Sequence, residues 1–251
     1  IIFFIGLFKK VVISDYFNIF TISNHVMPEM GFIESWALSL SYTMQIYYDF
    51  SGYSDMAIGS GLIFGISLPN NFNSPYKSLS LIEFWRRWHI TLSNFLTYYL
   101  FFPILSSFKI INKFKELSLV FFVMIVMGIW HGASFNYLFF GIFHGFGLII
   151  NHLWRVTNIK INNVLSWLIL FLFINISFLI FYSPDFEVFK NILKGMIGLN
   201  GIGLKDLRNL YLNEILNTNL GENFTILSLK YILVLFSSII LIFSKINSED
   251  F

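Results

Sequence analysis

Residues 117–154 read LSLVFFVMIVMGIWHGASFNYLFFGIFHGFGLIINHLW, the longest stretch of the chain without Lys, Arg, Asp or Glu. One helix of this length would be roughly 57 Å long at about 1.5 Å per residue, whereas the hydrocarbon core of a bilayer is only about 30 Å thick. The run must therefore break and return. We predict helices at 117–130 and 134–154, with a break at residues 128–134, where two glycines flank Trp130 and His131. Because an imidazole in hydrocarbon is costly, we expect His131 to face the interior of a helical bundle.

The composition around this stretch is that of a membrane protein. The chain is 56% hydrophobic and 12% charged, with a mean hydropathy of +0.71, whereas soluble domains average about 25% charged residues. Its apolar runs are long and continuous rather than short and alternating, which favours helices over a transmembrane barrel. We therefore predict an all-α, multi-pass bundle that forms a single membrane-embedded domain over residues 1–251, with the lipid bilayer as its first partner.

Charge and cysteine content exclude several function classes. A net charge of +2 is too small to indicate a nucleic-acid partner, and the absence of cysteine excludes disulfides, thiolate metal sites and cysteine nucleophiles. The chain opens at Ile1 with no initiator Met and no charged region typical of a signal peptide. We expect it to be the C-terminal part of a longer protein that carries further N-terminal helices.

The remaining segments are predicted from their hydropathy and their turn residues. Lys9 and Lys10 end a first apolar segment, and a mixed segment follows to about Asn24. The Pro- and Asn-rich residues 69–75 are predicted to form a loop. Further helices are predicted at 35–48 and 56–68, separated by a turn at 49–55, and at 80–105, 161–182 and 226–244.

Basic residues in the connections indicate an orientation, because Lys and Arg favour the cytoplasmic side of a membrane. Three lysines lie in residues 106–116, Arg155 and Lys160 lie in the next connection, and Lys245 follows the last apolar segment. If these connections are cytoplasmic, the Trp-His-Gly turn between them points away from the cytoplasm.

Four motifs in a fixed order carry a family resemblance. They read GLFKKVVISD at 6–15, YYDFSGYSDMAIG at 47–59, EFWRRWHITLS at 83–93 and GIWHGASFNYLFFGIFHG at 128–145. Together they resemble the membrane-bound O-acyltransferase (MBOAT) family, in particular its bacterial polysaccharide branch, which includes the membrane subunit of alginate O-acetyltransferase. The SGYSDMAIG string followed by PNNFNSPY looks more like this O-acetylating branch than the related D-alanyl transfer proteins.

The resemblance implies a fold and a reaction. The family has many transmembrane helices around a central tunnel, in which a cytoplasmic acyl donor and a hydroxyl acceptor meet at a histidine from opposite sides. His131 matches that catalytic histidine, and His89 matches the family's second histidine. The implied donor is acetyl-CoA or another acyl thioester, with no bound cofactor or metal. The implied acceptor is an exported polysaccharide such as alginate, in the cell inner membrane, with a periplasmic acyltransferase subunit as a further partner.

The chemistry of His131 agrees with this role independently. Acyl transfer to a sugar hydroxyl requires removal of the hydroxyl proton as attack proceeds, and a neutral imidazole does this near pH 7. Trp130 is placed to wall such a site, and Gly132 allows close approach of the backbone. The alternative is a buried histidine whose ring hydrogen-bonds a neighbouring carbonyl.

The other candidate residues each have two interpretations. His89 can orient the donor or hold an acceptor hydroxyl, or it can be a histidine of the membrane interface. Arg86 and Arg87 can bind donor phosphates, but two arginines at an interface are usually topological anchors. With Trp130 and Asp49 they complete the set of predicted substrate-binding residues.

Two further groupings are weaker. Asp49 and Asp55 flank Ser51 and suggest a Ser/His/Asp triad, but no Gly-x-Ser-x-Gly motif is present, and capping or solvated carboxylates are more common in a turn. His144 and His152 are eight residues apart, near one helix face, which admits a haem or metal site. Without neighbouring carboxylate or Cys ligands, core packing is favoured for both.

Three functions remain open on the sequence. The favoured one is transfer of acetyl groups to an exported polysaccharide, with His131 as general base and His89 as its partner. The first alternative is D-alanyl transfer to teichoic acid by the same mechanism. The second is a transporter or a bis-histidine haem protein.

Overall fold

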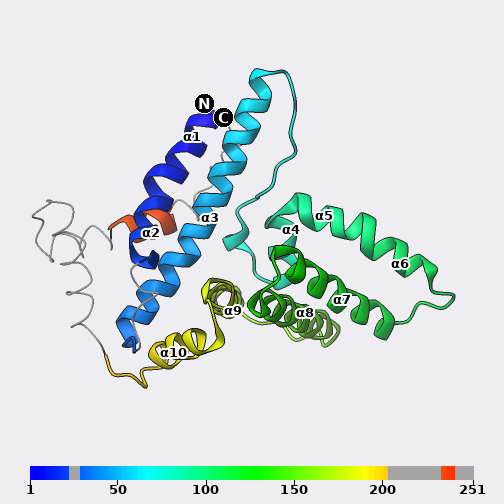
Figure 1. The fold of residues 1–251 in the computed structure, drawn as a ribbon. Helices are drawn as coiled ribbons and strands as arrows, with labels where there is room; N and C mark the ends of the chain where they lie inside the picture. The colour runs from blue at the N-terminus through cyan, green and yellow to red at the C-terminus, as the bar shows by residue number, and fades with distance from the viewer. Residues whose placement is uncertain (23–28, 203–232, 241–251) are drawn as a thin grey trace, which may run out of the picture. The chain divides into compact units, whose positions relative to one another are not determined.

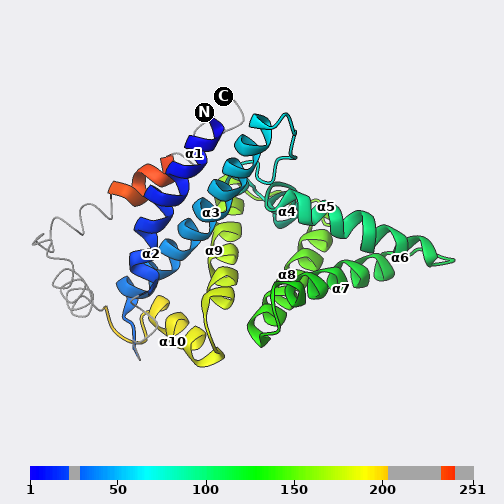
Figure 2. The same ribbon diagram turned by 45° about the horizontal axis from the view of Figure 1, so that its top comes forward.

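A computed structural model describes residues 1–22, 29–202 and 233–240 (Figures 1 and 2). These described residues form helices, turns and loops, and none of them forms a β-strand. The all-α fold class is therefore confirmed. The chain divides into two compact units, residues 1–60 with 183–251 and residues 61–182. Each unit is described by itself.

The first unit is built on a long helix, α3, with the N-terminal segment beside it (Figure 1). Its described elements are α1 (Ile2–Phe8), the π-helical η1 (Lys9–Ser14), α2 (Asp15–Ile22), α3 (Phe32–Ile63, whose last three residues belong to the second unit) and α10 (Phe186–Met196). Residues 233–240 are also helical. The rest of the predicted 226–244 segment, Asn24 and Lys245 lie outside the described residues.

The predicted turn at residues 49–55 is wrong, because α3 runs through it as one helix. The small residue Gly52 faces Gly6 of α1. A Cβ atom added at Gly52 would lie 2.7 Å from the Gly6 carbonyl oxygen, and one added at Gly6 would lie 2.5 Å from the Gly52 carbonyl oxygen. The glycine and serine residues that usually indicate a turn serve here to let two helix backbones approach closely.

Ion pairs join η1, which continues α1, to α3, and they explain the two aspartates. Lys9 Nζ lies 2.6 Å from Asp55 Oδ2, and Lys10 pairs with Asp49. The lysines therefore continue the helical segment instead of ending it. A carboxylate inside a helix that packs on apolar neighbours is tolerated when an opposite charge compensates it.

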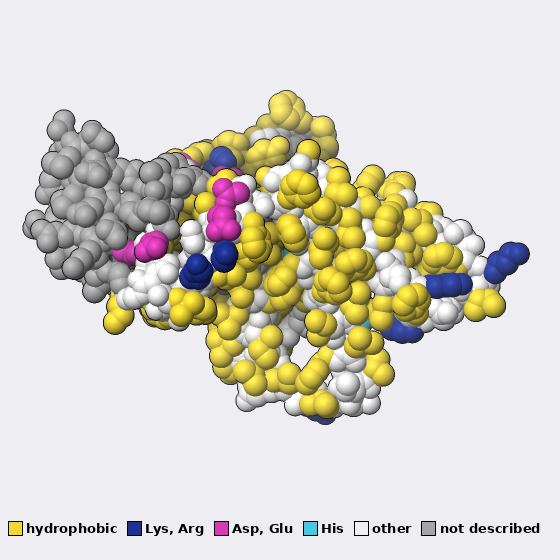
Figure 3. Space-filling model, turned by 60° about the horizontal axis from the view of Figure 1, so that its bottom comes forward, with side chains coloured by type: hydrophobic (Ala, Val, Ile, Leu, Met, Phe, Trp, Pro, Cys, Tyr) yellow, Lys and Arg dark blue, Asp and Glu magenta, His cyan; other side chains and the backbone are white. Residues whose placement is uncertain are grey.

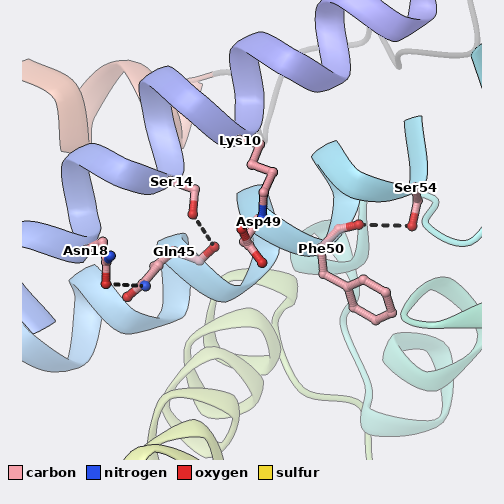
Figure 4. A network of polar contacts seen from close by, with 7 residues as sticks. All are labelled: Lys10, Ser14, Asn18, Gln45, Asp49, Phe50 and Ser54. Carbon is pink, nitrogen blue, oxygen red and sulfur yellow. Dashed lines mark hydrogen bonds and ion pairs between the residues drawn. The ribbon is translucent and has the colours of Figure 1, made fainter. Parts of the chain in front are cut away.

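Figure 4 shows further polar contacts between α3 and the segment formed by η1 and α2. Ser14 Oγ donates to the Gln45 carbonyl oxygen at 3.3 Å, and Gln45 Nε2 donates to Asn18 Oδ1 at 2.8 Å. These contacts fix the register of η1 and α2 against α3, because each donor meets an acceptor at the same level of the neighbouring helix.

The second unit holds a hairpin of long helices and a short-helix segment before it (Figure 2). Its elements are η3 (Pro75–Lys77), α4 (Leu81–Arg87), α5 (Ile90–Leu96), the π-helical η4 (Thr97–Phe101), α6 (Phe102–Ser107), α7 (Lys113–His131), α8 (Phe135–Val156) and α9 (Asn163–Tyr182). The helices predicted at 117–130, 134–154 and 161–182 are confirmed, with ends that shift by a few residues.

The single helix predicted at 80–105 is wrong, since the chain breaks after α4. Trp88 is extended and His89 has a left-handed backbone with φ 45° and ψ 54°. The predicted loop at 69–75 is confirmed, and it pairs with the break: Ile90 N donates to the Asn71 carbonyl oxygen, and Asn73 N donates to that of Arg87. Backbone groups that a continuous helix would satisfy internally are thus satisfied by this loop.

Three described helices, α7, α8 and α9, are long and apolar enough to cross a membrane. Their outward faces carry large exposed apolar side chains, among them Phe146 and Ile150 of α8 and Val164 of α9. Figure 3 shows apolar side chains over much of the visible face, with basic ones gathered near the α6–α7 connection. Such a surface is stable in lipid, so this is a helical membrane protein.

Candidate functional site

The break in the long apolar run lies at residues 132–134, as predicted. α7 ends at His131, and Gly132 follows with φ +155°. A Cβ atom there would lie 2.6 Å from the Tyr137 ring, so only glycine fits this turn. Ser134 then caps α8 by accepting a hydrogen bond from Asn136 N at 3.3 Å. Glycine and serine therefore set where the run turns back and fix His131 at the end of α7.

Two more glycines hold α7 against α8 just before this turn. A Cβ atom at Gly128 would lie 2.3 Å from the Tyr137 carbonyl oxygen, and one at Gly141 would lie 2.4 Å from that of Met124. The backbones of the two helices are thus in direct contact. Because His131 follows Gly128 by less than one helical turn, this crossing positions its side chain.

His131 is half-buried and surrounded by aromatic rings. The ring centroids of Trp130 and Phe181 lie 5.0 and 5.1 Å from that of His131, and those of Phe140 and Tyr137 lie 6.2 and 6.3 Å away. No hydrogen bond to the imidazole is found within the described part of the chain. The expectation that His131 faces protein neighbours is supported, because rings of α8 and α9 cover it.

His89 lies near His131, and the Trp130 ring lies beside both imidazoles. The centroid of the Trp130 ring is 6.2 Å from that of His89 and 5.0 Å from that of His131. The sum of these two distances is the largest possible separation of the two imidazole centroids. The two rings are therefore within the roughly 10–15 Å of one another that is expected for groups that flank one bound substrate. Trp130 is 60% exposed.

Burial and position determine the protonation of His89. Its half-buried ring has a pKa lowered to about 4, chiefly by desolvation and secondly by the positive charge that His131 can carry. His89 is therefore neutral at pH 7. Its Nδ1 lies 3.1 Å from Oδ1 of Asn71 in the preceding loop. His89 thus combines a left-handed backbone position with a side chain that is held by a loop residue.

The structure separates the two arginines. Arg87 forms an ion pair with Glu83 at 2.8 Å and donates to the Asn73 carbonyl oxygen at 3.3 Å, so it holds the loop to α4. Arg86 is exposed and lines a cavity. Of the two, Arg86 is the one placed to meet a ligand.

This cavity has a volume of about 400 Å³ and lies beside α7. Its walls are mostly apolar residues of α4, α5, η4, α7 and α8, and its polar contributors include Arg86, Ser93, Asn94 and His152. The volume falls within the range of small-molecule sites, roughly 300–1,000 Å³. An apolar cavity with a cationic residue in its wall fits an amphiphilic anion.

His144 and His152 differ from one another. His144 is fully buried, its Nδ1 accepts a hydrogen bond from Trp85 Nε1 at 3.2 Å, and its ring lies 4.4 Å from that of Phe140. The core interpretation is thus confirmed for His144. His152 is half-buried and lines the cavity, so that interpretation is wrong for it. Among the described residues no group of three His, Cys, Asp or Glu side chains is arranged to hold a metal ion.

The Asp49, Ser51 and Asp55 group has structural partners in the first unit. Both aspartates pair with lysines, as described above, and Ser51 Oγ is buried on α3. The triad interpretation is therefore not supported, and a substrate-binding role for Asp49 stays a prediction.

Sequence reasoning missed two positions in this region. Asn71 holds His89, and Trp85 both lines the cavity and binds His144. The asparagine lies in the PNNFNSPY string, which is predicted to be a loop, but nothing in that string indicates which asparagine contacts a residue 18 positions later. Such a contact becomes visible only in the folded chain.

The site therefore consists of two histidines beside one indole and an adjacent apolar cavity, within a helical membrane protein. The model of the membrane-bound O-acyltransferase (MBOAT) family matches residues 2–183, and the chain belongs to this family.

Relatives with curated names match most of the chain. It is 46% identical to a peptidoglycan O-acetyltransferase of Helicobacter pylori over 81% of its length, and 38% identical to a probable alginate O-acetylase of Pseudomonas aeruginosa over 80%. It is 28% identical to a teichoic acid D-alanyltransferase of Bacillus subtilis over 73% of its length and half of that relative. The chain spans about two fifths (39%) of the first two relatives.

Proposed function

We propose that the protein to which this chain belongs transfers acetyl groups from a thioester donor to hydroxyls of an exported cell-surface polysaccharide. His131 acts as the general base. It takes the proton of the acceptor hydroxyl as the oxygen attacks the thioester carbonyl. The new C–O bond forms, the C–S bond breaks, and the proton passes on to the departing thiolate. Metal ions and bound cofactors take no part in this scheme.

The observation that carries the proposal is the placement of both His89 and His131 beside the Trp130 ring. A neutral imidazole at the end of an apolar helix, with aromatic neighbours and no described hydrogen bond, is available to accept a proton from a substrate. Family membership supports the class of reaction. Acetyl is favoured over D-alanyl because the relatives named for O-acetylation match more of the chain, 81% and 80% of it against 45% and 73% for the two D-alanyltransferases.

The cavity along α7 supports a route for the donor. It extends beside residues 120–127 of α7, towards the end that carries His131, and Arg86 lies in its wall. The first residues of α7 and the last residues of α8 lie together, since Lys113, Glu116 and Arg155 are charged neighbours of His152. If these basic connections are cytoplasmic, a donor such as acetyl-CoA enters from the cytoplasm with its phosphates near Arg86.

The same orientation gives a location and partners. α7, α8 and α9 cross the bacterial inner membrane, and the His131 turn faces the side from which a polysaccharide is accessible. A periplasmic acyltransferase subunit that receives the group is a further proposed partner. Nucleic acid is not among the partners proposed.

The test is replacement of His131 by Gln in the full-length protein in its native host. We expect the ester-linked acetyl content of the exported polymer to fall about 10²- to 10⁴-fold, the usual contribution of a general base, with unchanged protein in the membrane fraction. The matched control is His144→Gln, which keeps an acceptor for Trp85 and should retain most activity. Normal acetylation in His131→Gln would overturn the proposal. Ester-linked D-alanine in place of acetate would support the alternative donor group.

A further inference from the structure

Asn71, in the loop at residues 69–75, forms a hydrogen-bonded cluster with His89 and its neighbours at the break between α4 and α5. Its Oδ1 atom lies 3.1 Å from His89 Nδ1, 3.3 Å from Thr91 N and 2.9 Å from Thr91 Oγ1. The backbone of Asn71 also takes part, since its carbonyl oxygen accepts from Ile90 N at 3.0 Å. One loop residue is thus bound to three consecutive residues, from His89 to Thr91, at the break before α5.

The backbone of Thr91 identifies the amide atom of Asn71 that faces this cluster. A peptide N–H group can only donate, so the atom that it contacts must be an acceptor. The side-chain amide of an asparagine has one acceptor atom, its oxygen, and the two orientations are distinguished by such contacts. Oδ1 therefore faces Thr91, and the same oxygen faces His89.

This assignment determines which nitrogen of His89 carries the proton. A neutral imidazole has one N–H donor and one acceptor nitrogen. Because Asn71 Oδ1 is an acceptor, Nδ1 of His89 has to be the donor. The lone pair of the neutral ring is then on Nε2.

We infer that Asn71 is a positioning residue that holds His89 in the Nδ1–H tautomer, so that Nε2 accepts a hydrogen bond from a sugar hydroxyl next to the one that His131 deprotonates. This inference rests on the proposed acyl transfer for its substrate, but the tautomer itself does not depend on that function. Asn71 acts through His89 and touches no reacting atom. The role resembles that of residues that fix the ring orientation of metal-bound and catalytic histidines.

The electrostatic surroundings of His89 are consistent with a neutral ring. His131 on α7 is the ionisable group whose charge acts on it in the described structure. On α4, Arg87 is engaged with Glu83. The partners in the loop and in α5, Asn71 and Thr91, are uncharged, so they orient the imidazole without stabilising an imidazolium.

The chain offers a matched control in the same loop. Asn73 is exposed, and its described contacts, with Arg87, use backbone atoms only. Asn71→Ala removes the acceptor, Asn71→Asp keeps an acceptor oxygen and adds a negative charge, and Asn73→Ala changes the same residue type two positions away. All three leave the backbone contacts of the loop in place.

The experiment measures the His89 tautomer by ¹⁵N NMR of the imidazole in purified full-length protein at pH 7, with the signal assigned by its loss in His89→Gln. We expect the Nδ1–H form in the wild type, Asn71→Asp and Asn73→Ala, and a mixture or the Nε2–H form in Asn71→Ala. A wild-type ring in the Nε2–H form, or an unchanged tautomer in Asn71→Ala, would overturn the inference.

Acetylation of the polymer gives the second measurement. We expect Asn71→Ala to lose about 10- to 100-fold, as for other residues that orient a functional histidine, and Asn73→Ala to lose little. Asn71→Asp should be active at alkaline pH. As the pH falls, this variant should lose activity at a higher pH than the wild type does, because the carboxylate raises the pKa of His89. A merely structural role predicts no such shift. Failure of the proposed function is a separate result, recognised by normal acetylation in His131→Gln.

Discussion

The contact of α1 and η1 with α3 and the hairpin of α7 and α8 both bring helix backbones together at glycines. In the first contact, the ionisable side chains meet opposite charges, as Lys9 meets Asp55 at 2.6 Å. In the second, His131 meets aromatic rings and no described hydrogen-bond partner. An ion pair commits its charges to holding two helices together, whereas an imidazole among rings keeps a nitrogen available for a substrate. The difference separates a structural use of ionisable residues from a catalytic one.

The largest expected effect is on stability, in the paired region. Asp55→Asn leaves Lys9 without its counter-charge where both side chains are mostly buried, 18% and 11% exposed. Removing one partner of a buried pair costs about 3–5 kcal/mol. We therefore expect much less protein in the membrane fraction by immunoblot, and a lower unfolding temperature of what remains.

Two companion variants sharpen this prediction. The double variant Lys9→Met with Asp55→Leu should recover most of the protein, because an apolar pair can replace a buried ion pair. Asp49→Asn should cost at most about 1 kcal/mol, since Lys10 and Asp49 are 39% and 47% exposed. Equal losses for Asp49→Asn and Asp55→Asn would contradict the account of this region. Lost acetylation with normal amounts of Asp49→Asn protein would instead support Asp49 as a substrate-binding residue.

A substitution at the contact of α7 and α8 should cause a smaller loss of stability. In an ordinary helix, Gly→Ala stabilises by about 1 kcal/mol. At Gly141 the new Cβ atom would lie 2.4 Å from the Met124 carbonyl oxygen, and overpacking of this kind costs about 1–3 kcal/mol. We expect Gly141→Ala to lower the unfolding temperature in detergent. Ile150→Ala on the exposed face of α8 should change it less. A more stable Gly141→Ala protein would show that the helices do not touch at this point.

The smallest predicted effect is a pH dependence of stability from His89. Burial lowers the pKa of the folded His89 from 6.5 to about 4, so between these values the unfolded chain binds more protons. Stability should therefore rise as the pH increases from about 4 to 6.5 and gain nothing more from this group above that range. His89→Gln should show a shallower rise. Unfolding temperatures at pH 5 and pH 7 measure the difference, and equal slopes in both proteins would contradict it.

The sequence predicts the hairpin well, because its physical constraint is local. A charge-free run longer than a bilayer is thick must turn, and glycine and serine at residues 128–134 indicate where. His131 and its position at the end of α7 follow from that alone. The family motifs add its partner, His89, whose place beside Trp130 the structure supports.

The two errors about where helices break or continue arise where contacts are distant in the sequence. Gly52 and its neighbours resemble a turn until α1 packs against them, since small residues suit both a turn and a close helix contact. The break at His89 depends on Asn71, and a hydropathy pattern along residues 80–105 contains no information about that loop. Local patterns predict elements, but partners from elsewhere in the chain decide whether an element continues.

The most direct test of the difference between His131 and the ion pairs measures the acetyl ester on the polymer per copy of membrane-inserted protein, for one variant in each region. The two variants are His131→Gln and the Lys9→Met, Asp55→Leu double variant, both in the full-length protein. We expect a loss of at least about 10²-fold per copy for His131→Gln and near-normal activity per copy for the double variant. Near-normal activity of His131→Gln, or an equal loss per copy in the double variant, would contradict the division between a catalytic histidine and structural ion pairs.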